Sequence, residues 1–257
     1  MNLQDKIVVV TGGASGIGLA LCERFVKEGA TVVLSDLKAD AASEQAGRIG
    51  AIAMAANVAK EEDVTRLVEE TIRQFGRVDL FVSNAGIAVG TSEQSSNKEW
   101  DLIWQVNTMS HVYAARAVLP GMLQRGAGYL LNVASAAGLL TELHSAPYAV
   151  TKHAAVAFAE WLAISYAGRG IKVSCLCPEF VQTPMIENEG TDWEFIKANA
   201  IPVSTVVEKV LDGLRDERFL ILTHDSTLPA FQGRALDHEK WLSRMRGYRA
   251  KMFGEEA

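Results

Sequence analysis

The first 36 residues run strand, glycine-rich turn, helix, strand and carboxylate, an order that few folds accommodate. Residues 6–10 read Lys-Ile-Val-Val-Val, which is typical of a strand buried on both faces. The turn Thr-Gly-Gly-Ala-Ser-Gly-Ile-Gly follows at 11–18, before a predicted helix over 19–28 and a second strand over 31–35. Glycines let the backbone approach a pyrophosphate, whose charge is stabilised at a helix N-terminus. The pattern therefore predicts a dinucleotide-binding unit, and a tight structural turn is the alternative.

Asp36 ends the second strand, eighteen residues after Gly18. A carboxylate in this place accepts hydrogen bonds from the ribose hydroxyls of a dinucleotide and repels a 2′-phosphate. The position favours NAD over NADP, although Lys38 lies two residues further on and would soften that preference. Asp36 is also suited to cap the next helix.

Strands and helices continue to alternate along the chain. We predict further strands over 51–55, 78–83, 129–134, 172–177 and 218–223, and further helices over 39–49, 61–75, 99–124, 148–167 and 203–217. Such alternation implies right-handed crossovers and a parallel sheet within a single domain spanning 1–257. Residues 184–202 have mixed polarity and are predicted to form a substrate lid, and the polar tail 224–257 is predicted to hold one helix.

Composition excludes several classes of partner. The net charge of −6 and the lack of a basic run argue against nucleic acid and anionic membranes. Three cysteines are too few for a disulfide framework, and no Cys/His spacing suits a metal, so buried thiols are expected. The N-terminus does not read as a signal peptide and no apolar run reaches membrane-spanning length, which predicts a reducing cytoplasm.

The most reactive pattern is Tyr148-x-x-x-Lys152, with Ser135 thirteen residues upstream. Residues i and i+4 share a helix face, and a nearby cation lowers the pKa of a phenol from its usual ~10. The spacing therefore predicts a tyrosine with a lowered pKa that exchanges a proton during hydride transfer, or else an ordinary surface pair. Ser135 follows a predicted strand, at the edge of the sheet where ligands bind.

Two further strand ends carry small or polar residues. Asn57 and Val58 are placed to meet an adenine edge, and Asn84-Ala85-Gly86 forms a turn beside the cofactor that Asn84 can pin. Asn107 is a polar residue in an otherwise apolar predicted helix, where a satisfied core amide is the plain interpretation.

Together these motifs resemble the short-chain dehydrogenase/reductase family over nearly the whole chain. The matches are Thr-Gly-Gly-Ala-Ser-Gly-Ile-Gly at 11–18, Asn-Ala-Gly at 84–86, Asn107, Ser135 and Tyr-x-x-x-Lys at 148–152. The resemblance implies an α/β fold with a Rossmann-like, doubly wound sheet of seven parallel strands in the order 3-2-1-4-5-6-7, and helices on both faces. It also implies NAD(P)-dependent chemistry between an alcohol and a ketone.

The resemblance assigns a role to each member of a tetrad. Tyr148 is the acid/base, and Lys152 lowers its pKa and binds the nicotinamide ribose. Ser135 orients the substrate oxygen, and Asn107 holds a water that links Lys152 to solvent. The expected cofactor contacts are Gly12, Ser15, Gly16, Ile17, Gly18, Asp36, Leu37, Asn57, Val58, Asn84, Ala85, Gly86, Tyr148, Lys152, Pro178, Val181 and Thr183. The resemblance further implies a homotetramer, or a homodimer, built on the helices at 99–124 and 148–167.

Two positions depart from the family pattern. Glu179 stands where glycine usually follows proline, and its carboxylate would touch substrate or point to solvent. Asn57 stands where aspartate is common, which should alter adenine contact only slightly.

The substrate pocket is the least constrained prediction. Its expected lining is mixed but largely apolar, which favours a hydrophobic or aromatic secondary alcohol: Ala136, Leu139, Glu142, His144, Glu179, Met185 and Trp193. The whole pattern predicts an NAD-dependent secondary-alcohol oxidoreductase. An NADPH-dependent ketoreductase and a non-catalytic NAD-binding sensor or scaffold are the alternatives.

Overall fold

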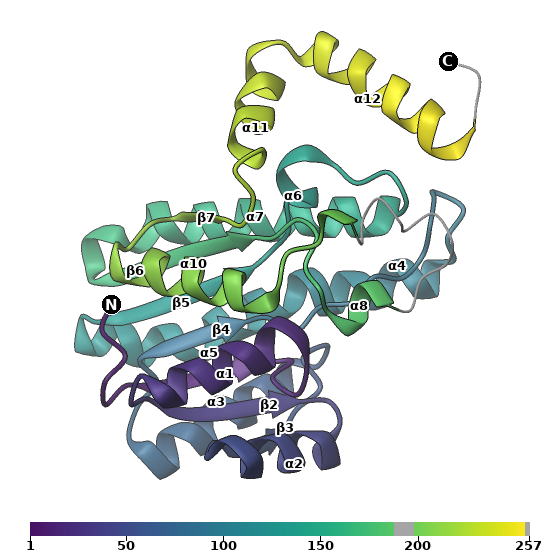
Figure 1. The fold of residues 1–257 in the computed structure, drawn as a ribbon. Coiled ribbons are helices and arrows are strands. Elements are labelled where there is room, and N and C mark those ends of the chain that lie inside the picture. The colour runs from purple at the N-terminus through teal and green to yellow at the C-terminus, as the bar shows by residue number, and fades with distance from the viewer. Residues whose placement is uncertain (188–197, 255–257) are drawn as a thin grey trace.

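A computed structural model describes residues 1–187 and 198–254 (Figure 1). Seven parallel strands form one sheet in the order β3-β2-β1-β4-β5-β6-β7, which confirms the predicted topology. The strands are β1 (Ile7–Thr11), β2 (Thr31–Asp36), β3 (Ile52–Ala55), β4 (Leu80–Ser83), β5 (Gly128–Val133), β6 (Ile171–Cys177) and β7 (Leu220–Leu222).

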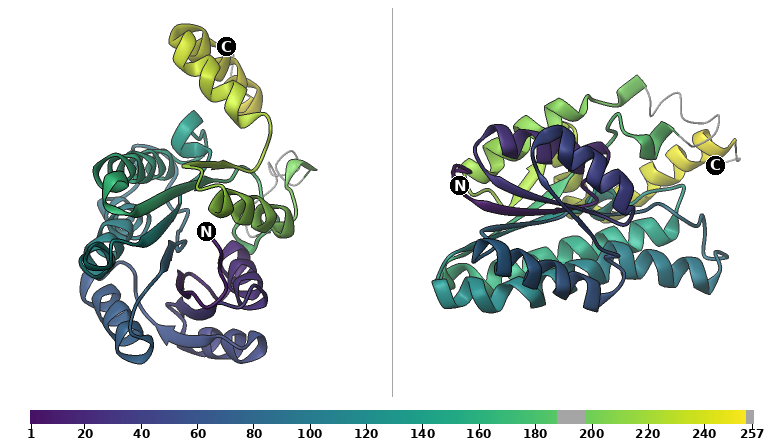
Figure 2. Two further views of the ribbon diagram at one scale, coloured as in Figure 1. Left: turned by 90° about the vertical axis from the view of Figure 1, so that its left-hand side faces the viewer. Right: turned by 90° about the horizontal axis from the view of Figure 1, so that it is seen from below.

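The central strands are apolar throughout because both faces of the sheet are covered. In β1, Val8 and Val10 point into one hydrophobic cluster and Val9 into the other, and all three are fully buried. Helices α1 (Gly16–Lys27), α2 (Ala39–Ile49) and α10 (Val203–Arg215) contribute side chains to the first cluster. Helices α3 (Glu61–Phe75), α5 (Ser110–Arg125) and α7 (Ala146–Tyr166) contribute to the second, so the molecule has three layers (Figure 2).

The helix predicted over 99–124 is interrupted. It consists of α4 (Asn97–Trp104), a π-helical segment over Gln105–Met109, and α5. Asn107 lies in the middle of the π-helical segment, and such wide turns often occur at functional sites. Ser96 begins α4 with a capping box that includes Glu99.

Helix α7 begins two residues earlier than predicted. Ser145 caps it by accepting a hydrogen bond from Tyr148 N at 3.2 Å, and Pro147 occupies the first turn, where its missing N–H costs nothing. The cap fixes the backbone of Tyr148 at the start of the helix.

The C-terminal tail differs from its prediction. It contains two helices rather than one, α11 (Thr227–Leu236) and α12 (His238–Phe253). Pro229 and Gly233 weaken the helical pattern of α11 in the sequence, and packing against the short helix α6 (Ala137–Leu140) provides the missing stabilisation. Of the predicted lid over 184–202, α8 (Pro184–Glu187) is seen, and 188–197 lie outside the described residues.

Among the described residues, no helix is both long enough and apolar enough to cross a lipid bilayer.

A buried polar pair joins α5 to β5. His111 of α5 is 1% exposed, and its Nδ1 lies 2.9 Å from Oδ1 of Asn132 in β5. Within the described chain, His111 Nε2 and Asn132 Nδ2 have no hydrogen-bond partner. Burial, and secondarily the charge of Lys152, lowers the pKa of His111 to about 4.

This pair makes stability depend on pH in the acid range. A histidine in an unfolded chain has a pKa of ~6.5, so the unfolded state takes up this proton first as the pH falls from 6.5 to 4. We expect His111 to lower the free energy of unfolding by up to about 3 kcal/mol over that interval. Urea denaturation across this pH interval should show that the free energy of unfolding falls less in His111→Gln than in the wild type. Identical pH dependence in both proteins would contradict the assignment.

Candidate active site

The predicted site residues come together at the carboxyl ends of β1, β4, β5 and β6. The glycine-rich turn follows β1, the turn at 84–86 follows β4, Ser135 follows β5, and Pro178 follows β6. Parallel strands bring these ends to one edge of the sheet, which is where open α/β sheets bind ligands.

Three of the four glycines of the turn illustrate different roles. Gly12 has a positive φ of 62°, and a Cβ there would lie 2.9 Å from Ala85 Cα. A Cβ on Gly18 would lie 2.2 Å from Gly12 O, so this glycine allows α1 to pack on the turn. Gly16 also has a positive φ, 52°, and a Cβ there would lie 3.4 Å from Thr183 Cγ2. The turn and the loop after β6 therefore face each other across Gly16.

The start of α1 fits a phosphate group. Across the described chain, no side chain caps α1, and its first turn contains no acidic residue. The first N–H groups of a helix have no partner within the helix and carry partial positive charge. Ser15, Gly16 and Ile17 thus present backbone donors that suit a pyrophosphate.

The adenosine side of the cofactor would lie at the ends of β2 and β3. Asp36 pairs in register with Ala55, and its carboxylate accepts hydrogen bonds from Ala14 N and Lys38 N, both at 3.2 Å. Leu37 is 67% exposed although it is apolar. Asn57 Oδ1 accepts from Ala59 N at 3.0 Å, which shapes the turn that contains Val58. These contacts leave an open edge where a ribose and an adenine could lie.

Asn84 braces the cofactor turn from the neighbouring strand. Its Nδ2 donates to Thr11 O at 2.9 Å and to Gly12 O at 3.1 Å. The backbone N–H groups of Asn84 and Ala85 donate to Thr11 Oγ1. The Asn84 side chain therefore holds the backbone of the glycine-rich turn and connects the ends of β1 and β4.

Asn107 is fully buried and holds the segment after the 84–86 turn. Its Oδ1 accepts from Ile87 N and its Nδ2 donates to Ile87 O, each at 2.9 Å. Nδ2 also lies 3.3 Å from Thr151 Oγ1 of α7. A Cβ on Gly86 would lie 3.3 Å from Lys152 Nζ and 3.4 Å from Asn107 Oδ1, so the absence of a side chain keeps room beside the lysine.

Ser135, Tyr148 and Lys152 lie together as the spacing predicts. Lys152 is 3% exposed, and its Nζ donates to Val133 O at 3.2 Å and lies 5.6 Å from the centre of the Tyr148 ring. Ser135 lies near enough to the Tyr148 hydroxyl to lower the pKa of that phenol. Ser135 Oγ also accepts from Ala137 N at 3.1 Å and donates to Pro178 O at 3.3 Å.

The predicted lowering of the Tyr148 pKa is wrong. Burial raises the pKa of Tyr148, and the neighbouring Ser135 only opposes that rise. Burial also lowers the pKa of Lys152 to about 8, which the neighbouring Cys175 and Cys177 counteract. The desolvation of the two groups therefore outweighs the attraction between them that the spacing suggests.

Two predicted substrate residues are tied to each other. The carboxylate of Glu142 accepts from the backbone N–H groups of His144 and Ser145, and lies 2.8 Å from His144 Nδ1. The ring of His144 also meets that of Phe253 edge to face, with centroids 5.5 Å apart. Both side chains thus shape the loop that leads to Tyr148.

Glu179 has a role that the sequence does not reveal. Its carboxylate accepts hydrogen bonds from Thr227 Oγ1 and, at 3.4 Å, from Ser226 Oγ. One oxygen of the carboxylate is therefore engaged at the start of α11.

The remaining predicted substrate residues, and the predicted cofactor contact Val181, differ in how far they are exposed. Ala136 and Leu139 are buried behind Ser135, and Met185 of α8 is exposed. Val181 is buried and pairs with Ile201. Trp193 lies outside the described residues.

Gly138 is a site residue that sequence reasoning missed. A Cβ there would lie 2.5 Å from Lys152 O and 2.8 Å from Val156 Cγ2. The glycine therefore allows α6, which follows Ser135, to pack directly on α7, which carries Tyr148 and Lys152. The pattern Ser-x-x-Gly is too common to indicate this contact.

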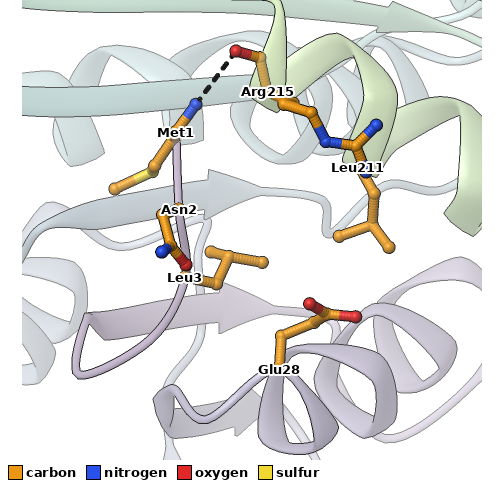
Figure 3. Close-up of a pocket in the computed structure, with 6 residues that line it drawn as sticks. All are labelled: Met1, Asn2, Leu3, Glu28, Leu211 and Arg215. Carbon is orange, nitrogen blue, oxygen red and sulfur yellow. Dashed lines mark hydrogen bonds between the residues drawn. The ribbon is translucent and has the colours of Figure 1, made fainter.

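A separate hollow lies at the opposite edge of the sheet (Figure 3). It is lined by Met1, Asn2, Leu3, Glu28, Leu211 and Arg215, at the amino ends of the strands. None of these residues is near the tetrad in the fold, so the hollow is no part of the active site. In the part of the chain that the structure describes, no three His, Cys, Asp or Glu side chains gather as a metal site.

A family model described as short chain dehydrogenase matches residues 6–194. The chain belongs to the short-chain dehydrogenase/reductase family. Among its members, a short-chain dehydrogenase/reductase from Burkholderia phymatum in complex with NAD has a TM-score of 0.86 at 28% identity, covering 93% of this chain and 96% of that one. A 3-ketoacyl-(acyl-carrier-protein) reductase from Brucella melitensis complexed with NADH has a TM-score of 0.78 at 30% identity, covering 86% and 96%.

Named dehydrogenases of the family are also similar in sequence. The 1-deoxy-11-beta-hydroxypentalenate dehydrogenase of Streptomyces exfoliatus is 34% identical, with 87% of this chain and 85% of that protein covered. The 2-(R)-hydroxypropyl-CoM dehydrogenase of Xanthobacter autotrophicus is 34% identical, with 71% and 77% covered. This short-chain dehydrogenase/reductase is therefore an oxidoreductase with relatives that act on hydroxyl groups.

The packing of α6 on α7 can be tested through Gly138. We expect Gly138→Ala to lower the free energy of unfolding by about 1–3 kcal/mol, because the methyl group must displace α6 from α7. Turnover should fall further than stability explains, since Ser135 moves with α6. Gly47→Ala is the matched control, as nothing lies within 4 Å of its Cβ position in α2. Thermal unfolding and turnover at saturating cofactor are the measurements, and equal behaviour of the two variants would contradict the packing role.

Proposed function

We propose that this chain is an NAD-dependent oxidoreductase that interconverts a secondary alcohol and a ketone, with Tyr148 as the acid/base. The observation that supports this most directly is the position of Tyr148, whose ring centre lies 5.6 Å from the buried Nζ of Lys152 and whose pKa is influenced by the neighbouring Ser135. A non-catalytic NAD-binding scaffold has no need of such a costly buried charge.

In the direction of oxidation, the substrate hydroxyl takes the place of the contact between Ser135 Oγ and Pro178 O. Ser135 turns its proton from Pro178 O, which lies at 3.3 Å, to the substrate oxygen. Tyr148, as the phenolate that the nearby Lys152 ammonium stabilises, then accepts the hydroxyl proton and becomes neutral while the substrate carbon gives up a hydride. The oxidised nicotinamide supplies the hydride acceptor and a positive charge that favours the phenolate. Reduction is the reverse.

Lys152 needs a route for protons because it is buried. Asn107 of the π-helical segment and Thr151 of α7 lie next to it, joined by the contact between Asn107 Nδ2 and Thr151 Oγ1 at 3.3 Å. We propose that Asn107 holds a water between Lys152 and solvent, in the space that Gly86 leaves open. A neutron or high-resolution crystal structure with no ordered water there would contradict this step.

The cofactor preference depends on the end of β2. Asp36 presents a carboxylate that repels a 2′-phosphate, and Lys38, whose N–H donates to that carboxylate, would only soften the preference. The similar structures from Burkholderia phymatum and Brucella melitensis contain NAD and NADH. We therefore propose NAD rather than NADP.

The substrate proposal is limited to a class. Ala136 and Leu139 give the wall behind Ser135 an apolar character, which favours a hydrophobic secondary alcohol. The relatives are named for chemically different substrates, among them L-fucose for a Bos taurus protein 33% identical to this chain. A screen of cyclic, aromatic and aliphatic secondary alcohols with NAD⁺ tests the class, and activity confined to charged or sugar alcohols would contradict it.

Assembly and location are proposals as well. Trp161 and Ile164 on α7 and Leu102 and Trp104 on α4 are exposed apolar side chains, which supports a homotetramer or homodimer through these helices. Light scattering that gives the mass of a monomer would contradict this. The charge and cysteine content support a cytoplasmic location, which fractionation of the source cells would test.

Removing the phenol tests the proposed chemistry. We expect Tyr148→Phe to lower kcat for alcohol oxidation at least ~100-fold, because general acid–base catalysis contributes that much or more. The dissociation constant of NADH, measured by fluorescence, should change little, since the ring remains. A variant that retains most of its turnover would contradict the role of Tyr148.

Replacing Asp36 tests the cofactor preference. We expect Asp36→Ala to shift the ratio of kcat/KM for NADP⁺ over NAD⁺ upward by roughly 10-fold or more, because the repulsion of a 2′-phosphate is lost. Asp40→Ala is the control, since it removes a nearby carboxylate in the first turn of α2 instead of the one at the end of β2. An unchanged ratio would show that Asp36 does not discriminate.

A further inference from the structure

The last two helices form a unit that stands out from the body of the molecule. We call residues 224–254, which contain α11 and α12, the C-terminal arm (Figures 1 and 2). Helix α11 packs on α6, and its Phe231 packs against the cluster between the sheet and α7. The arm therefore contacts the body next to the segment that follows Ser135.

Glu179 anchors the first turn of α11. Its carboxylate accepts hydrogen bonds from Thr227 Oγ1 and Ser226 Oγ, and its N–H donates to Thr223 Oγ1 at 3.2 Å. A negative charge at a helix N-terminus is stabilised by the helix dipole. The preceding carbonyl, that of Pro178, accepts from Ala136 N at 2.8 Å and from Ser135 Oγ. The arm is thus attached one residue away from a direct contact of the serine.

Arg234 anchors the other end of α11. Its Nη1 donates to Leu139 O in α6 and lies 3.0 Å from Nε2 of His153 in α7. His153 Nδ1 lies 2.8 Å from Ala149 O, and a carbonyl can only accept, so the proton is on Nδ1. Nε2 is then the acceptor for Arg234. One guanidinium group therefore joins the turn after Ser135 to the helix that carries Tyr148 and Lys152.

Helix α6 needs such support from outside. It has four residues, too few to be stable alone, yet it follows Ser135 and packs directly on α7 through Gly138. A hydrogen bond from a charged donor is roughly twice as strong as a neutral one. Arg234 can thus hold the carbonyl end of α6 against α7.

We propose that Arg234 is a positioning residue of the active site: it clamps α6 onto α7 and so sets Ser135 against Tyr148. This inference rests on the proposed function of Ser135 and Tyr148. Helix α11 becomes a working part of the site, and Glu179, in place of the family's usual glycine, is the residue that attaches it.

Steady-state oxidation of an alcohol that the wild type accepts tests the proposal. We expect Arg234→Ala to lower kcat roughly 10- to 100-fold with less than about twofold change in KM for NAD⁺, because α6 shifts while the cofactor turn does not. Arg234→Lys should recover part of kcat, since it keeps a charged donor for Leu139 O. Arg246→Ala, an exposed position on α12, is the control and should match the wild type. An unchanged kcat in Arg234→Ala, or an equal loss in Arg246→Ala, would overturn the proposal.

Amide hydrogen exchange separates this proposal from the proposed function. Exchange of residues 137–141 should accelerate in Arg234→Ala and in Glu179→Ala but not in Arg246→Ala. That result supports the clamp whether or not the wild type oxidises a secondary alcohol. A wild type that oxidises none would overturn the proposed function and leave the clamp standing. Unchanged exchange in both anchor variants would overturn the clamp whatever the activity. If Arg234→Ala does not fold, Arg234→Lys and Glu179→Ala decide by the same two measurements.

Discussion

The arrangement of the active site depends on one buried charge. Lys152 has its ammonium group inside the protein, where it donates a hydrogen bond to the carbonyl of Val133 at 3.2 Å. A buried ammonium is costly unless its surroundings satisfy it. The elements around it are held in place accordingly: Asn107 fastens the segment at Ile87, Gly86 leaves room, and α6 lies against the backbone of Lys152 at Gly138. Each of these contacts comes from a different part of the chain.

The same burial opposes the chemistry that the site is proposed to perform. Burial raises the pKa of Tyr148 and lowers that of Lys152, so it favours the neutral form of each group. In the proposed function, the positive charge of the oxidised cofactor offsets this effect of burial. Coupling proton transfer to the presence of the oxidised cofactor would follow directly from that balance. His111, one layer below, is neutral for the same reason.

The C-terminal arm shows how a family site is completed by residues that the family pattern does not include. Glu179 and Arg234 lie 55 residues apart in the sequence and tie the two ends of α11 to the segments around Ser135. The arm is otherwise lightly attached, since within the described part of α12 only Trp241 is buried. The anchoring contacts of the arm with the body are therefore those of α11, next to the segments around Ser135.

The sequence by itself determined the sheet, its strand order and the family, because apolar runs, glycine turns and short motifs are local signals that survive without coordinates. It also placed the tetrad, since a helix puts Tyr148 and Lys152 on one face and parallel strands bring their carboxyl ends to one edge. Only the tertiary structure decided the direction of the pKa shifts, because desolvation depends on everything packed around a group and outweighs the single charge that the spacing reveals. It likewise decided the π-helical turn at Asn107, the second helix of the tail, and the partners of Glu179, Gly138 and Arg234. Those features depend on contacts between residues far apart in the chain, and no local pattern in the sequence records them.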